Sequence, residues 1–185
     1  MSESPDPSAR DLVRPLLRVR QIREFTPELP TDEELAAIAD AARWSGSSAN
    51  TQPWHFIVIR DREVLARLAA GGVPQTRTLR TASTAIAIVL PEGGHEVSLA
   101  YDEGRATERI LIAANLLGLT AGIAWIRKDI ASLASEVLGL PADRFVRTIM
   151  AIGHPTEAGL RPKSAPGKAR LPRDQVVFEE RWPRG

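Results

Sequence analysis

The chain has 185 residues, of which 43% are hydrophobic and 25% are charged, and its formal net charge is +1. This length and composition are typical of one globular domain. Because the chain contains no cysteine, it can have no disulfide, thiolate-bound zinc, iron–sulfur cluster or catalytic thiol.

Targeting and membrane segments are not expected. No run of 18 apolar residues occurs, and the polar N-terminus MSESPDPSAR lacks the basic and apolar stretches of a signal peptide. We therefore expect a cytoplasmic protein that does not associate with a membrane.

The positive charge gathers near the two ends of the chain. Residues 10–23 carry a net charge of +4 and residues 157–185 carry +3, whereas residues 24–156 carry −4. The two basic segments are either two solvated faces or two segments that meet around one anionic ligand. Basic residues do not alternate with aromatic ones, so no nucleic-acid partner is expected.

The N-terminal part predicts two helices after a short tail. Residues 1–9 are polar and contain Ser and Pro, which favours disorder. The apolar spacing within residues 12–17 predicts a short amphipathic helix with a proline in or near its first turn. Thr31 and Glu34 form a capping-box pattern. They predict the start of a second helix, which ends near Gly46.

Four strands are predicted further along the chain. Aromatic and β-branched residues favour strands at residues 54–60, 120–126 and 144–152. The continuous apolar run at residues 85–90 is typical of a central strand that is covered on both faces.

Three helices are predicted between these strands. Asp61 is placed to cap the first, and a long amphipathic helix is expected over residues 96–117. Asp129 is placed to cap the third, which Gly139 closes. The adjacent acids Asp102 and Glu103 are expected to be solvated.

The last segment differs from the rest in composition. Residues 157–185 are rich in Pro, Gly and basic residues and end in a cluster of Val, Phe and Trp. Since such a cluster seldom lies free in water, we expect it to pack on another surface such as a second subunit. The chain is thus divided into a disordered N-terminus (1–9), one domain (10–156) and a C-terminal arm (157–185).

Familiar catalytic patterns are absent from the sequence. His55, His95 and His154 lie far apart with no carboxylate at metal-ligand spacing, so no metal site is expected. The G-x-G-x-x-G and P-loop patterns do not occur, and the serines of the WSGSSAN turn do not form a G-x-S-x-G elbow. No side chain is assigned a catalytic role.

Three polar segments remain as candidates for ligand binding. Residues 20–23 (RQIR) contain two Arg that can bind a phosphate. Lys168 and Arg170 in the tail can also bind a phosphate. Residues 47–54 (SSANTQPW) offer small polar groups for a flat, heteroatom-rich ligand. Each segment alone can be a helix start, a turn or a solvated tail. Together they describe a ligand with an anionic end and a flat polar edge.

These segments are also where the sequence resembles the FMN-dependent nitroreductase family. The resemblance holds in order and spacing over most of residues 18–178. It is carried by R-x-x-R-x-F at 20–25, A-A-R-x-x-x-S-x-x-N-x-Q-P-W at 41–54, A-A-N-x-L-G-L at 113–119, I-G-H-P at 152–155 and K-x-R-L-P at 168–172.

The resemblance implies a fold and an assembly. The implied fold is α+β, with a mixed central sheet flanked by helices and an extended C-terminal arm. The implied assembly is an intertwined homodimer with two FMN sites at its interface, in which each arm reaches over the partner subunit.

The resemblance also implies which residues contact FMN. Arg23 would lie near the N1/O2 edge of the ring, where a cation makes reduction easier. The implied contacts are Arg20, Gln21 and Arg23 from one subunit, Ser47, Ser48 and Asn50 from the other, Lys168 and Arg170 at the phosphate, and the backbone of Ala121 and Gly122 near the ring.

The sequence departs from the family pattern at several of these places. Gln21 stands where the family has Ser, so one phosphate contact is missing. The family's Asn and Lys before the second predicted strand correspond to Gln75 and Thr78. Arg77 or Arg80 could supply the positive charge that Thr78 lacks.

The implied activity is a flavin-linked oxidoreduction. The protein would take hydride from NADH or NADPH and reduce a nitroaromatic, a quinone or a related small acceptor, with ping-pong kinetics and all hydride chemistry at FMN N5. The alternatives are an FMN-binding protein for storage or sensing without turnover, a specialised member acting on a non-nitro compound, and a structural dimer that binds no flavin.

Overall fold

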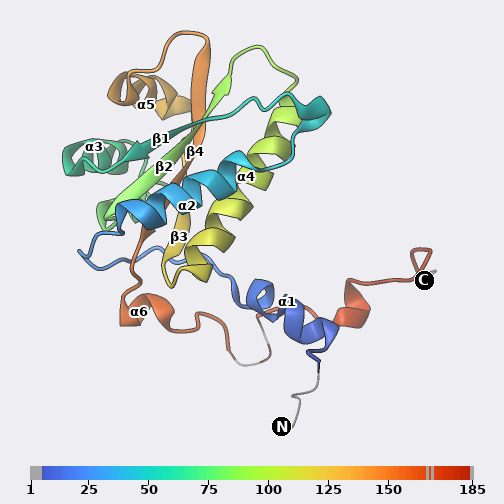
Figure 1. The fold of residues 1–185 in the computed structure, drawn as a ribbon. Coiled ribbons are helices and arrows are strands. Elements are labelled where there is room, and N and C mark those ends of the chain that lie inside the picture. The colour runs from blue at the N-terminus through green and yellow to red at the C-terminus, as the bar shows by residue number, and fades with distance from the viewer. Residues whose placement is uncertain (1–5, 166, 168, 184–185) are drawn as a thin grey trace.

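Four antiparallel strands form the central sheet of the protein, whose computed structural model describes residues 6–165, 167 and 169–183 (Figure 1). The strands are β1 (His55–Ile59), β2 (Thr84–Pro91), β3 (Thr120–Trp125) and β4 (Arg144–Gly153), in the spatial order β1-β2-β4-β3. The α+β class is confirmed. Within the described residues the sheet is antiparallel and not mixed. Each of the three strand pairs, β1 with β2, β2 with β4 and β3 with β4, is antiparallel.

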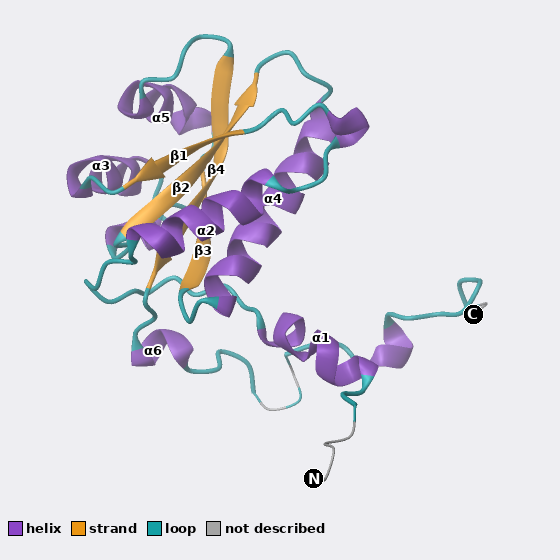
Figure 2. Cartoon of the chain, in the orientation of Figure 1, coloured by secondary structure: helices purple, strands orange, loops and turns teal. Residues whose placement is uncertain are grey.

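Two pairs of helices cover the two faces of the sheet (Figure 2). Helices α2 (Asp32–Arg43) and α4 (Glu96–Leu116) lie on one face, and α3 (Arg62–Gly71) and α5 (Ala131–Leu138) lie on the other. Successive residues of β2 alternate between the two hydrophobic clusters. This alternation explains why its sequence is a continuous apolar run.

The predicted capping box at the start of α2 is confirmed. The hydroxyl oxygen of Thr31 accepts a hydrogen bond from the amide of Glu34 at 3.2 Å. The Glu34 carboxylate in turn accepts from the amide and the hydroxyl of Thr31, at 2.7 and 2.9 Å. These hydrogen bonds, the one from the amide first, hold the pKa of Glu34 below its ordinary value. The helix ends at Arg43, before the predicted end near Gly46.

The predicted cap of α5 is wrong. The residue that precedes this helix is Ile130, with no side-chain cap, and Asp129 lies in a short 3-10 turn. The Asp129 carboxylate is engaged by Arg127 and is not free to cap a helix. The predicted end of α5 is confirmed, because Gly139 adopts a left-handed φ of 63°.

An extended N-terminal segment, residues 20–26, lies along the free edge of β3 and beside the end of β4. The amide of Ile22 donates to the carbonyl of Ala121 at 3.0 Å, and the amide of Thr26 donates to the carbonyl of His154 at 2.9 Å. A Cβ atom on Gly122 would lie 2.3 Å from the carbonyl oxygen of Ile22. Glycine at 122 is therefore required for this segment to approach the strand.

Both ends of the described chain extend away from the sheet and its helices (Figure 1). Helix α1 (Ala9–Arg18) begins at a capping box formed by Ser8 and Asp11 and has no buried residue. Its proline lies inside the helix, beyond the first turn where it was expected. Most of the segment predicted to be disordered, residues 1–5, lies outside the described residues. The boundaries of the arm remain a prediction.

Beyond β4 a short helix, α6 (Glu157–Leu160), precedes the extended C-terminal segment. Among the described helices, none combines the length and the apolar character needed to cross a bilayer.

Candidate functional site

A cavity of about 490 Å³ opens at the edge of the sheet beside β3. This volume is within the range of ligand-binding cavities. Three segments that are distant in sequence contribute its walls: the extended N-terminal segment, the loop after α3, and the second half of β3. The lining residues are Gln21, Arg23, Pro74, Gln75, Arg77, Ile123 and Trp125.

Gln21 and Arg23 are held in the cavity wall by β3 and by each other. The side-chain oxygen of Gln21 accepts a hydrogen bond from the backbone amide of Ile123 at 3.3 Å. It also accepts one from Nη2 of Arg23 at 3.1 Å. The Gln21 side chain thus takes the place of a main-chain carbonyl beside the edge of β3 and orients the neighbouring guanidinium group.

The loop between α3 and β2 contributes Gln75 and Arg77. Thr78, the position that corresponds to the family's Lys, is buried and its hydroxyl oxygen has no hydrogen-bond partner among the described residues. Arg80 borders a different cavity, beside α3. Of the two arginines considered from the sequence, Arg77 is therefore the one at this site.

Arg127 contacts the lining residue Gln75, and the sequence alone does not identify it. Its Nη1 donates to the side-chain oxygen of Gln75 at 2.8 Å. Its Nε and Nη2 donate to the two carboxylate oxygens of Asp129, at 3.0 and 2.6 Å. These hydrogen bonds hold the pKa of Asp129 below its ordinary value. No local pattern could have identified Arg127, because its partner Gln75 lies 52 residues earlier in the chain.

Ser47, Ser48 and Asn50 do not line the cavity within one chain. They belong to the loop after α2, in which Ser48–Asn50 forms a short 3-10 turn. The amide of Ser48 donates to both carboxylate oxygens of Asp102 in α4, at 3.0 and 3.1 Å. One chain therefore carries the predicted contacts at two separate places.

The backbone of this loop is strained. Ala49, Asn50 and Gln52 have positive φ angles of 49°, 55° and 47°. Such angles are uncommon in residues other than glycine and cost about 1–3 kcal/mol each. The hydroxyl of Ser47 accepts from the amide of Gln52 at 2.9 Å, and Asp102 holds the loop from the other side. These hydrogen bonds hold residues 47–52, called the contact loop below, in this conformation.

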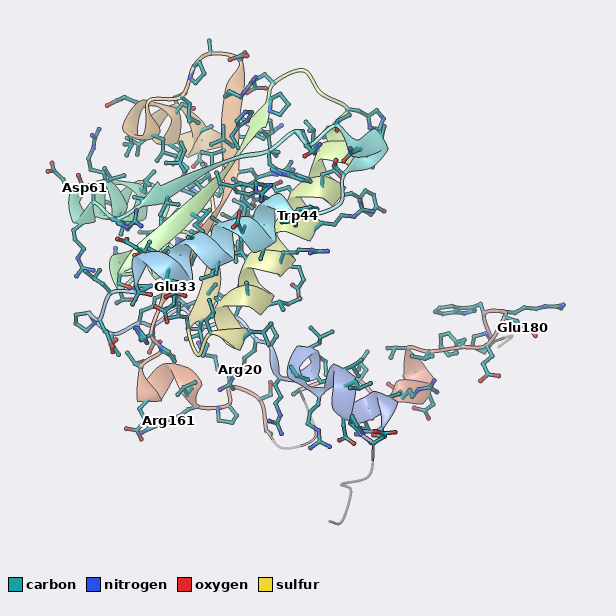
Figure 3. All side chains as sticks on the ribbon, viewed as in Figure 1. Arg20, Glu33, Trp44, Asp61, Arg161 and Glu180 are labelled. Carbon is teal, nitrogen blue, oxygen red and sulfur yellow. The ribbon has the colours of Figure 1, made fainter. Side chains whose placement is uncertain are left out.

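Of the residues expected to bind a phosphate, Arg20 and Arg170 do not line the cavity. The guanidinium group of Arg20 donates to the carbonyl of Leu160 at the end of α6, and Figure 3 shows this side chain beside that helix. Arg170 donates to the carbonyl of the adjacent Ala169 at 2.8 Å. Lys168 lies outside the described residues. The phosphate site therefore remains a prediction.

Ala121 and Gly122 are not among the residues that line the cavity. The carbonyl of Ala121 accepts from the amide of Ile22, and Gly122 permits the close approach of the same residue. Their role in this structure is to position the segment that carries Gln21 and Arg23.

The expectation of a solvated acid pair in α4 is wrong. Asp102 is 1% exposed and Glu103 is 4% exposed. Each finds a partner from a distant part of the chain, which periodicity alone cannot reveal. Asp102 accepts from Ser48, and Glu103 accepts from Arg147 in β4.

The arrangement at the cavity suits a flat ligand with polar edges. Pro74, Ile123 and Trp125 offer apolar contact, while two guanidinium and two amide groups surround them. Guanidinium groups bind anionic oxygens strongly. A planar heterocycle whose edge carries oxygen and nitrogen acceptors fits this set of groups.

Comparison with known proteins agrees with this chemistry. Residues 18–74 match the sequence profile of the nitroreductase family. Over 146 residues the chain is 33% identical to a protein of Archaeoglobus fulgidus that is named as an NADH dehydrogenase/NAD(P)H nitroreductase, and the match covers 75% of this chain and 82% of that protein. It is also 27% identical over 184 residues to an NADPH-flavin oxidoreductase of Vibrio harveyi, covering 92% of this chain and 74% of the relative.

Solved structures show the same fold. An FMN-dependent nitroreductase of Clostridium difficile superposes with a TM-score of 0.78 at 26% identity, over 89% of this chain and 97% of that one. An NADPH:FMN oxidoreductase of Vibrio harveyi, solved with NAD+, superposes with a TM-score of 0.76 at 24% identity, over 93% and 78% of the two chains.

Proposed function

Since this chain belongs to the nitroreductase family, we propose that it is an FMN-dependent oxidoreductase that takes hydride from NADH or NADPH and reduces a small acceptor. The observation that carries this proposal is the cavity beside β3, in which Gln21, Arg23 and Gln75 lie together as the resemblance implies.

The residues present fit FMN. The flavin ring is flat, is apolar on its faces and carries acceptors on its pyrimidine edge. The cavity offers Ile123 and Trp125 for the faces and Gln21, Arg23 and Gln75 for the edge. The additional cation, Arg77, suits a group that becomes more negative when reduced.

Bound FMN would supply hydride transfer at its N5 atom, so the proposed reaction requires no catalytic side chain. The residues of the chain bind and orient. Arg23 and Arg77 provide positive charge at the cavity wall, and Gln21 keeps Arg23 in place through its hydrogen bond. Ile123 and Trp125 provide apolar surface for the faces of the ring.

A homodimer completes the proposed site. The contact loop 47–52 lies apart from the cavity in one chain, so a second copy would bring its own loop to this cavity. Exposed apolar side chains support such a dimer, since large unpartnered apolar faces mark interaction surfaces. They are Val97, Tyr101 and Leu116 on α4, Leu12, Val13, Leu16 and Leu17 on α1, and Leu171, Val176, Val177 and Trp182 in the C-terminal segment.

The acceptor is proposed to be a nitroaromatic, a quinone or a related small oxidant. A cytoplasmic location belongs to the same proposal, because the nicotinamide donor is supplied there. Two predictions test the function and the assembly.

The first prediction concerns the flavin. We expect the purified protein to bind FMN and show the yellow absorbance band of oxidised flavin. Adding NADH or NADPH without oxygen should bleach that band, and adding a nitroaromatic or a quinone should restore it. A protein that binds FMN but is not bleached by either donor would favour storage or sensing. A protein that takes up no FMN would contradict the proposed function.

The second prediction concerns the dimer. Tyr101 on α4 is 70% exposed in one chain. We expect Tyr101→Glu to place a charge in the subunit interface, to convert the dimer into a monomer in sedimentation experiments, and to weaken FMN binding. The matched control is Leu29→Glu, which introduces the same charge at a position that is 63% exposed and far from α4 in sequence. Equal sedimentation of wild type and Tyr101→Glu would contradict an interface on α4.

A further inference from the structure

We propose that Arg127 is a positioning residue of the flavin site. It fixes the side-chain amide of Gln75 so that the NH₂ group of Gln75 faces the cavity and donates a hydrogen bond to the ligand there. This inference rests on the proposed function, because it takes FMN to be that ligand.

The orientation of Gln75 follows from the chemistry of its partner. A guanidinium group has only donors, so the atom of Gln75 that lies 2.8 Å from Nη1 of Arg127 must be the oxygen. The NH₂ group of the same amide is then left to bind elsewhere, and Gln75 lines the cavity. Without Arg127 the amide could turn over and present its acceptor instead.

Arg127 is itself held in a fixed geometry. The Asp129 carboxylate accepts from Nε and Nη2, which orients the planar guanidinium group and leaves Nη1 for Gln75. The backbone of this turn is fixed as well, because the amide of Ile126 donates to the carbonyl of Arg147 at 2.8 Å. The Asp129–Arg127–Gln75 chain of hydrogen bonds therefore runs from the protein surface to the cavity wall.

The side-chain amide of Gln21 has the same orientation in this cavity. The side-chain oxygen of Gln21 accepts from Ile123 and Arg23, so its NH₂ group is also left for a ligand. With Arg23 and Arg77, every polar side chain among the described residues of this wall then presents donors, and the wall contains no carboxylate.

A wall made of donors discriminates between the two redox states of the cofactor. Reduced FMN carries more negative charge on its pyrimidine edge than oxidised FMN, so hydrogen-bond donors bind the reduced state more tightly. Loss of the Gln75 donor should therefore weaken FMN binding and make the midpoint potential of the bound flavin more negative.

A mutant cycle tests whether Arg127 acts through Gln75. Gln75→Leu removes the amide and keeps Arg127. Arg127→Met/Asp129→Asn removes the orienting pair while the net charge of the site is unchanged. Each variant should weaken FMN binding about fivefold, as the loss of one hydrogen bond does, and lower the midpoint potential. The variant with all three substitutions should be no worse than Gln75→Leu alone, because both changes remove the same donor.

The outcomes separate this inference from the proposed function. The matched control is Arg80→Met, which removes a neighbouring arginine outside this cavity and should leave affinity and potential unchanged. Two results would overturn the positioning role of Arg127 while the proposed function stands, provided that wild type binds FMN. The first is that the effects of the two changes add in the combined variant. The second is that Arg127→Met/Asp129→Asn behaves as wild type. If wild type binds no FMN, the proposed function fails, and this inference fails with it.

Discussion

Replacing Gly122 by alanine should destabilise the protein by about 2–3 kcal/mol and abolish measurable FMN binding. The added Cβ would lie 2.3 Å from the carbonyl oxygen of Ile22, which is a contact between two backbones and cannot be relieved by a side-chain rotation. Strand β3 cannot shift away, because Ala121 and Ile123 on either side are paired with β4. The N-terminal segment must therefore move instead.

The displaced segment is the one that carries the ligand-binding groups. Moving Ile22 away from β3 breaks its hydrogen bond to Ala121 and the one between Gln21 and the amide of Ile123. Gln21 would then no longer orient Arg23 at the cavity. For this reason we expect the substitution to affect binding more strongly than the removal of any one side chain.

Urea denaturation and quenching of FMN fluorescence measure the two effects. The matched control is Gly46→Ala, whose new Cβ would meet only the Arg105 guanidinium group, at an ordinary 3.7 Å. This control should change stability by less than about 1 kcal/mol. Wild-type stability and affinity in Gly122→Ala would show that the segment does not depend on its close approach to β3.

The sequence predicts most of the elements because their signals are local. Thr31 and Asp61 cap the helices that follow them, as their spacing to the next amides indicates. The apolar run of β2 correctly indicates a strand covered on both faces. The failure at Asp129 has a specific cause: the carboxylate that would cap the helix is bound by Arg127, two residues earlier.

The candidate site is only partly predictable for the same reason. The residue pattern singles out Gln21 and Arg23, the family resemblance adds Gln75, and the structure places all three around one cavity. Arg77 was one of two candidates, and only its position in the fold separates it from Arg80. Arg127 gave no signal, since its contact with Gln75 exists only after the loop and the end of β3 are brought together.

The acids of α4 show what periodicity cannot reveal. Two adjacent carboxylates point in different directions, and each is buried against a distant segment. Asp102 fixes the strained contact loop through Ser48, whereas Glu103 joins α4 to β4 through Arg147. Helix α4 therefore connects the contact loop to the centre of the sheet, and its buried charges are costly to leave without a partner.

Replacing Arg147 by methionine should therefore destabilise the protein by about 3 kcal/mol, the lower end of the range for breaking a buried ion pair, because the Arg147 side chain is 30% exposed. Nε of Arg147 donates to Oε2 of Glu103 at 2.7 Å, and Nη2 donates to the same oxygen. The other carboxylate oxygen, Oε1, has no partner among the described residues. Without Arg147, Glu103 would remain buried with no compensating group.

A second substitution shows whether the loss of stability comes from the unpaired Glu103 charge or from the missing Arg147 side chain. Glu103→Leu in the Arg147→Met background removes the buried charge, so urea denaturation should show that most of the stability returns. The matched control is Arg67→Met, which breaks the exposed pair between Arg67 and Glu136, 2.9 Å apart. That change should cost less than about 1 kcal/mol. If Arg147→Met cost no more than Arg67→Met, the Glu103 carboxylate would have found water or another donor, and the link between α4 and β4 would rest on apolar packing alone.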